Sequence, residues 1–161
     1  MAVDMFLKIT DVKGESKDSK HSGEIQIESF SWGATQLGAS SHGTGAGAGK
    51  VSMQDFHFVM NNNSASPSLF LFCANGKHLK EATLTCRKAG GKQENFLIVK
   101  MSDVLISSYQ TGGSSGGGET PTDQISLNYT KIEIDALVQD EKGITKSAGK
   151  KWWDMKTNTG G

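Results

Sequence analysis

Alternation of apolar and polar residues with a period of two runs through most of this chain, and no other feature limits the possible folds as strongly. Residues 2–10 carry an apolar side chain at every second position, and residues 79–88 repeat the pattern. Successive side chains of a β-strand point to opposite faces, so this period is typical of strands with one buried face. Further strands are expected at 24–33, 50–60, 94–109, 124–138 and 151–156. We therefore predict a mainly β protein, built as a closed antiparallel barrel or a sandwich.

The apolar phase changes within the second of these strands. Ile25 and Ile27 have one parity, whereas Phe30 and Trp32 have the other. One extra residue in a strand shifts the phase of everything after it, which is the effect of a β-bulge. We expect such a bulge near residues 28–29, so that both aromatic side chains turn toward the core.

One segment departs from the alternating pattern and carries the signals of an α-helix. Ser66 and Pro67 are typical of an N-cap and of the first helical position, and Gly76 is a stop signal. The residues between them are apolar almost all round. A short helix of this kind is expected to plug a core, with Leu69 and Phe72 buried.

Two glycine-rich segments, 38–49 and 111–119, connect predicted strands. Segments of the length of 38–49 are usually functional in a compact domain. A phosphate-binding Walker loop is excluded, because Val51 stands where a Ser or Thr is required and Thr44 where the first glycine is required. We interpret 38–49 as an extended arm that serves assembly.

No part of the sequence carries a convincing catalytic or cofactor-binding constellation. Residues 43–48 match a relaxed dinucleotide pattern and residues 112–116 match a nucleophile elbow, but no helix is expected after either. The four histidines and two cysteines lack the spacing of metal ligands. We therefore expect no enzyme, no cofactor and no metal, and reduced thiols at Cys73 and Cys86.

Charge and hydropathy argue against two kinds of partner. The chain has 17 Lys and Arg against 17 Asp and Glu, so it lacks the basic field of a nucleic-acid-binding protein. No apolar run is long enough to span a membrane, and charged residues interrupt the N-terminus, which is not a signal peptide. We expect neither nucleic acid nor membrane insertion. A neutral chain does little to oppose self-association.

Read from end to end, the sequence resembles the hemolysin-coregulated protein (Hcp) family, the inner-tube proteins of bacterial type VI secretion systems. The resemblance covers nearly the whole chain in order. Its matching stretches are MAVDMFLKITDVKGESKD, FSWG, GAGKVSMQDF, SPSLFLFCANGKHL, TCRKAGGKQENFLIVKMSDVLISSYQTGGSSG, ETPTDQISLNY and the terminal tryptophan strand.

The resemblance implies a single domain over residues 1–161, folded as a two-sheet barrel with one helix and similar to phage tail-tube proteins. It implies homohexameric rings that stack into a hollow tube, with a contractile sheath outside and a spike protein at the tip. Small effectors would travel in the lumen. The protein would reside in the bacterial cytoplasm and then be secreted without a signal peptide.

Two sets of residues follow as candidates for this role. The face of the 24–33 strand opposite the aromatic side chains carries Ser29, Ser31 and Gly33, which are expected to line the lumen and contact effectors. An ordinary solvent-facing serine is the alternative for Ser31. Contacts between subunits or rings are expected from the arm, at Ser41, His42, Gly43, Thr44, Gly45, Gly47 and Gly49.

A different class of function is a monomeric β-barrel that binds a small ligand in its interior. The hydrodynamic mass of the protein separates the two, because a ring supports the tube and a monomer supports the ligand barrel. Enzymatic functions rank third.

Overall fold

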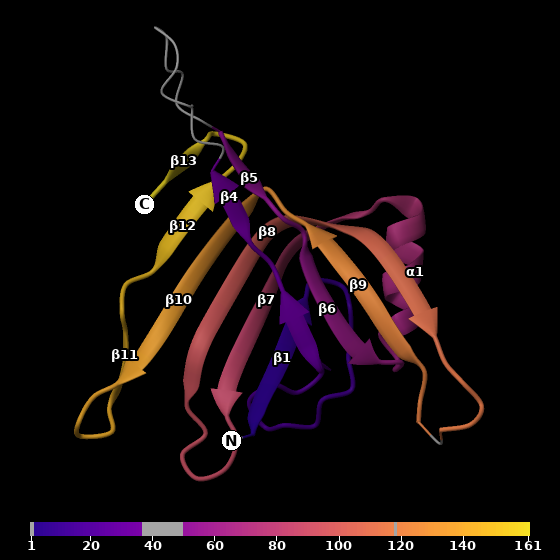
Figure 1. Ribbon diagram of the computed structural model, residues 1–161, viewed down its shortest axis with the longest axis horizontal. Coiled ribbons are helices and arrows are strands. Elements are labelled where there is room, and N and C mark those ends of the chain that lie inside the picture. The colour runs from indigo at the N-terminus through magenta and orange to yellow at the C-terminus, as the bar shows by residue number, and fades with distance from the viewer. Residues whose placement is uncertain (1, 37–49, 118) are drawn as a thin grey trace, which may run out of the picture.

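The computed structural model describes residues 2–36, 50–117 and 119–161. Within these ranges the chain forms thirteen strands and one helix (Figure 1). This confirms the predicted mainly β architecture with one short helix. In chain order the elements are β1 (Val3–Ile9), β2 (Ile25–Gln26), β3 (Ser29–Ser31), β4 (Ala34–Gln36), β5 (Val51–Met53), β6 (Phe56–Asn61), α1 (Ser66–Asn75), β7 (His78–Lys88), β8 (Asn95–Gly112), β9 (Thr122–Asn128), β10 (Lys131–Gln139), β11 (Thr145–Ser147), β12 (Lys151–Asp154) and β13 (Thr159–Gly160).

The long strand β8 organises the barrel. It has 18 residues and pairs with β7 along one edge. Along its other edge it pairs first with β10 and then with β9. The connected sheet therefore has two halves, one in the order β2-β1-β7-β8-β10-β12-β13 and one in the order β3-β6-β9. These pairings are all antiparallel.

Two backbone hydrogen bonds link the edges of the two halves where β2 gives way to β3. The amide of Ile27 donates to the carbonyl oxygen of Met5 on β1 at 3.0 Å. The next amide, that of Glu28, donates to the carbonyl oxygen of Val59 on β6 at 2.8 Å. The segment between β2 and β3 thus joins the free edges of the two halves.

This crossing replaces the bulge predicted near residues 28–29. The apolar phase changes there because β2 and β3 pair with different strands, β1 and β6. The strand predicted at 124–138 is also two strands, β9 and β10, which pair with successive parts of β8. In both places a phase change in the sequence marks a change of pairing partner.

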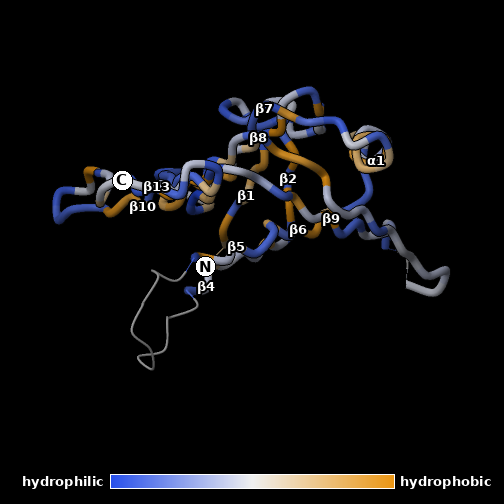
Figure 2. Tube along the Cα trace, turned by 90° about the horizontal axis from the view of Figure 1, so that it is seen from above, coloured by the Kyte–Doolittle hydropathy of each residue, from blue (hydrophilic) through white to orange (hydrophobic). Residues whose placement is uncertain are grey.

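Side chains from both halves fill the interior of the barrel. Figure 2 shows hydrophobic segments of β1, β6, β8 and β9 facing one another across it. The largest fully buried side chains belong to Phe56, Phe58, Leu7, Ile25, Met60, Leu69, Leu79, Leu84, Met101, Ile106, Ile125 and Leu127. Burial of this much apolar surface is the main favourable contribution to folding.

The helix α1 lies beside the barrel, and this corrects the prediction that it plugs the core (Figure 2). Leu69 is fully buried, Phe72 is partly buried against the core, and Phe70 and Leu71 are 58% and 52% exposed. The helix also begins differently from the prediction. Ala65 occupies the N-cap without a capping side chain, and Ser66 is the first helical residue.

Candidate assembly and lumen surfaces

Ser29 and Ser31 lie on the exposed face of the short strand β3. Phe30 between them turns toward the barrel, where its ring stacks on that of Phe56 with centroids 5.7 Å apart. β3 is fixed in this orientation by its antiparallel pairing with β6, in which Ser31 lies opposite His57. The two serine hydroxyls therefore share one open, polar face.

Gly33 is set apart from the two serines. The amide of Gln54 donates to the Gly33 carbonyl oxygen at 2.8 Å. A Cβ at position 33 would lie 3.2 Å from the side-chain oxygen of Gln54. The structure therefore brings Ser29 and Ser31 together and places Gly33 against a neighbouring segment.

The predicted arm residues Ser41, His42, Gly43, Thr44, Gly45, Gly47 and Gly49 lie outside the described residues. The strands on either side of them, β4 and β5, form a separate antiparallel ladder. At its base the hydroxyl of Tyr129 donates to the carbonyl oxygen of Gln54 at 2.7 Å. Burial, with a smaller contribution from the Asp55 carboxylate, raises the pKa of Tyr129 to about 12, so this donor keeps its proton.

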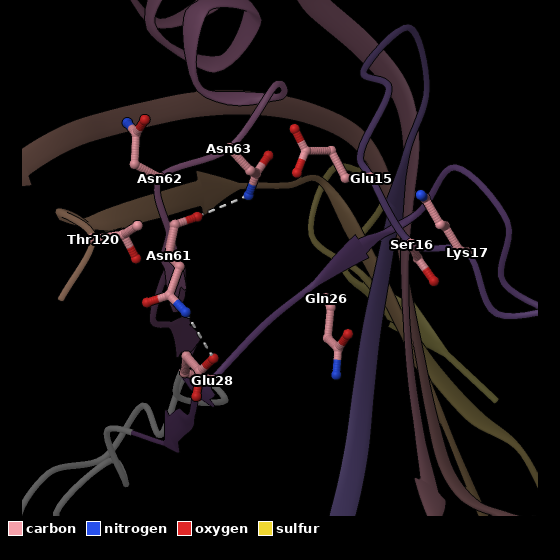
Figure 3. Close-up of a pocket in the computed structure, with 9 residues that line it drawn as sticks. All are labelled: Glu15, Ser16, Lys17, Gln26, Glu28, Asn61, Asn62, Asn63 and Thr120. Carbon is pink, nitrogen blue, oxygen red and sulfur yellow. Dashed lines mark hydrogen bonds between the residues drawn. The ribbon is translucent and has the colours of Figure 1, made fainter.

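An open polar pocket of about 490 Å³ lies where the loop before β2 meets the end of β6 (Figure 3). The amide of Asn61 donates to the Glu28 carboxylate at 3.4 Å, and Asn63 donates to the Asn61 carbonyl oxygen at 2.8 Å. Its lining is Glu15, Ser16, Lys17, Gln26, Glu28, Asn61, Asn62, Asn63 and Thr120. Two carboxylates against one lysine give this surface a negative charge, and it lacks the apolar lining typical of small-molecule sites.

A buried carboxylate, that of Asp123, joins the helix to the barrel. Asp123 is fully buried and accepts hydrogen bonds from Ser66 Oγ at 2.6 Å, Tyr109 Oη at 3.1 Å and Asn62 Nδ2 at 3.2 Å. Burial raises the pKa of Asp123, but hydrogen bonds from Ser66, Thr111, Asn62 and Tyr109 together outweigh it and hold the pKa below its usual value. Asp123 is therefore an ionised structural hub.

A second charged cluster fastens the loop before β2 to β7. Arg87 is 3% exposed and pairs with Asp18 and Asp4. Its guanidinium lies 4.8 Å from the centre of the Phe6 ring, and the His21 ring stacks on Phe6 at 4.3 Å. The hydrogen bond from Arg87 lowers the pKa of Asp18 to about 2. The two terminal nitrogens of Arg87 are paired within the chain, whereas its Nε has no hydrogen-bond partner. Pairing of this kind between β1, β7 and the loop before β2 is typical of a structural role.

Nothing in the described part of the chain has the geometry of a catalytic or metal centre. Among those residues no group of three or more His, Cys, Asp or Glu side chains could hold a metal ion. The thiols of Cys73 and Cys86 are free, and burial raises the pKa of Cys86 to about 11, which keeps it unreactive. No helix in the described ranges has the length and apolar character needed to cross a membrane.

Neither charged cluster is predicted by the sequence. Their members are far apart along the chain, and nothing in the local pattern marks Asp123 or Arg87 as buried. Asp123 lies just before the strand predicted at 124–138, and Arg87 has the outward parity of the strand predicted at 79–88, so neither position carried a signal of burial.

The fold defines the class of mainly β proteins in which antiparallel sheets surround one packed core. The family model described as "Type VI secretion system effector, Hcp" matches residues 6–135. The chain is 44% identical to "Protein hcp1" of Pseudomonas aeruginosa over 160 residues, covering 98% of both chains.

Solved structures of type VI secretion proteins are also similar to this chain. One titled "Structure of a type six secretion system protein" superposes with a TM-score of 0.91 at 30% identity and covers 99% of this chain and 100% of the other. Hcp1 from Salmonella typhimurium superposes with a TM-score of 0.81 at 30% identity and covers 99% of each chain. This chain belongs to the Hcp family of type VI secretion tube and effector proteins.

Proposed function

We propose that this chain is the structural subunit of a type VI secretion tube. Six copies form a ring, and rings stack into a hollow tube that carries small effectors in its lumen. The observation that supports this most strongly is membership of the Hcp family across nearly the whole chain. The sheath, the spike protein and the effectors are the expected partners. The subunit is made in the cytoplasm and leaves the cell through the apparatus rather than by a signal peptide.

The packing of the barrel argues against a monomeric ligand-binding barrel. Phe56, Phe58 and Met60 from one half and Leu84 and Met101 from the other are fully buried in the interior. A ligand in that space would have to displace well-packed core side chains, which costs several kcal/mol. The interior therefore serves stability.

The arm at 38–49 is proposed to contact a neighbouring subunit or ring. This proposal is supported by the length of the arm, its glycine content and its position between two paired strands. Deletion of residues 40–48 removes most of the arm. The barrel should still fold, because loop length has a small effect on closure entropy.

Size-exclusion chromatography with light scattering tests the ring. Six chains of 17.2 kDa give a mass of about 103 kDa, the product of these two numbers. Negative-stain images should show rings with a central pore. The variant lacking 40–48 should form fewer rings or stacks at equal concentration. A monomer at high protein concentration would contradict the tube.

Ser31 is proposed to face the lumen, where its hydroxyl offers one donor and two acceptors without closing the passage. Ser31→Asp places six added charges around the pore. We expect an intact ring that retains about tenfold less of the co-purifying effectors, equivalent to about 1.4 kcal/mol. Ser114→Asp, at an exposed serine in the 111–119 segment, is the matched control. Equal retention by the two variant rings would make Ser31 an ordinary surface residue.

A further inference from the structure

The two halves of the barrel differ in width, and the wider half leaves part of one face uncovered. The strands β10, β12 and β13 continue the sheet beyond the point where β9, β6 and β3 face it. Figure 1 shows these three strands on the side of the sheet away from α1, and Figure 2 shows β10 and β13 projecting from the barrel on that side. We call β10, β12 and β13 the overhang.

The apolar face of the overhang is continuous with the core. Ile134 on β10 lies directly opposite Val99 on β8, and directly paired residues share a face of the sheet. Val99 is fully buried inside the barrel. Along this face of β10 the exposed fraction rises from 4% at Ile132 to 36% at Ile134 and 56% at Val138. Ile134, Ala136 and Val138 are here called the apolar stripe.

Two lysines border the apolar stripe. Lys151 on β12 lies opposite Ile134, and Lys146 on β11 lies opposite Val138, so both side chains project from the same face as the stripe. Both lysines are exposed. An apolar surface with a charged rim is typical of a protein–protein interface.

A surface of opposite charge lies on the other flank of the same chain. The pocket of Figure 3 presents Glu15 and Glu28 against a single lysine, and Glu119 adjoins its Thr120. This pocket lies at the end of β6, on the flank of the barrel away from β12 and β13 (Figure 1).

We propose that the apolar stripe is an interface between copies of this chain, covered by the acidic flank of the next copy. The stripe and the acidic flank are different surfaces, so the contact is heterologous, and a heterologous contact that closes on itself generates a ring. This proposal rests on the proposed ring and assigns the surfaces that build it. Burial of Ile134 and Val138 supplies the apolar contribution, and the lysine rim sets the orientation.

Val138→Ser tests the apolar part of the contact, with Leu71→Ser as its matched control. Leu71 is 52% exposed on α1, close to the 56% of Val138, but lies outside the stripe. We expect Val138→Ser to raise the concentration at which half the rings dissociate at least tenfold. Leu71→Ser should leave it unchanged within about twofold. Far-UV circular dichroism of both variants checks the fold.

Lys151→Glu tests the charged rim. This reversal should also favour dissociation, and the second change Glu28→Lys in the same chain should restore rings, because every copy supplies both flanks. The Lys151→Glu and Glu28→Lys pair tests the proposed contact even if Val138→Ser fails to fold. The assigned surfaces would be wrong, although the ring itself would stand, if the Val138→Ser and Lys151→Glu variants form rings as stable as those of the wild type. The same conclusion would follow if Leu71→Ser were the one variant whose rings dissociate. A monomeric wild-type chain would overturn both.

Discussion

Leu69→Ala should lower the free energy of unfolding by about 2–5 kcal/mol, as expected for truncation of a fully buried leucine. Leu69 is 0% exposed and is the fully buried apolar residue of α1. Loss of its side chain leaves a cavity between the helix and the barrel. Urea denaturation, followed by tryptophan fluorescence at a single protein concentration, measures the effect.

Two neighbours on the same helix act as controls. Leu71→Ala should change the free energy of unfolding by less than about 0.5 kcal/mol, because Leu71 is 52% exposed. Phe72→Ala should fall between the two, since Phe72 packs against the core without being fully buried. Equal losses in the free energy of unfolding for Leu69→Ala and Leu71→Ala would show that burial of Leu69 does not anchor the helix to the barrel.

The error over the helix has a physical cause. Leu69, Phe70, Leu71 and Phe72 form a continuous apolar run, and such a run predicts a helix buried on all sides. In the structure only one face of the helix packs against the core, through Leu69 and Phe72, so Phe70 and Leu71 are left exposed. Sequence periodicity reports which faces are apolar, and it does not report whether another layer of the protein covers each of them.

The strands were more predictable than their connections. Alternation located most of the strand-forming segments, because a half-buried strand forces a period of two. The number of strands was underestimated where the chain changes partner without a turn signal, as between β2 and β3 and between β9 and β10. Pairing between distant strands decides these boundaries, and a local pattern carries little information about it.

The candidate site was predicted unevenly. Parity placed Ser29 and Ser31 on the face opposite Phe30, as the structure has them. The same argument failed to separate Gly33, since its contact with Gln54 depends on the fold of another segment. The apolar stripe was visible in the sequence as an alternating row, but its exposure depends on the unequal widths of the two barrel halves.

Asp123→Ala should lower the free energy of unfolding by about 2–4 kcal/mol, because it leaves buried hydrogen-bond donors without an acceptor. The Ser66 and Tyr109 hydroxyls both donate to this carboxylate. Removing it therefore loosens the start of α1 from the barrel. Urea denaturation at pH 7 measures the loss.

Asp55→Ala is the matched control. The Asp55 carboxylate also accepts two side-chain hydrogen bonds, from Ser107 Oγ at 2.7 Å and from Asn128 Nδ2 at 3.1 Å. Asp55 is exposed, so water can replace the lost contacts. We expect Asp55→Ala to cost less than about 1 kcal/mol. A similar loss in the two variants would show that burial of Asp123 has no special effect.

The stabilising effect of Asp123 should depend on pH in a defined direction. Its pKa is lower in the folded chain than in the unfolded chain, where an aspartate titrates near pH 4. The contribution of ionised Asp123 to the free energy of unfolding is therefore complete above about pH 4. This contribution declines as the pH falls through the lower folded-state pKa. Asp123→Asn, which cannot ionise, should be less stable than wild type at pH 7, and the difference should shrink below pH 4. A difference that stays constant from pH 7 to pH 3 would show that the pKa of Asp123 is the same in the folded and unfolded chains.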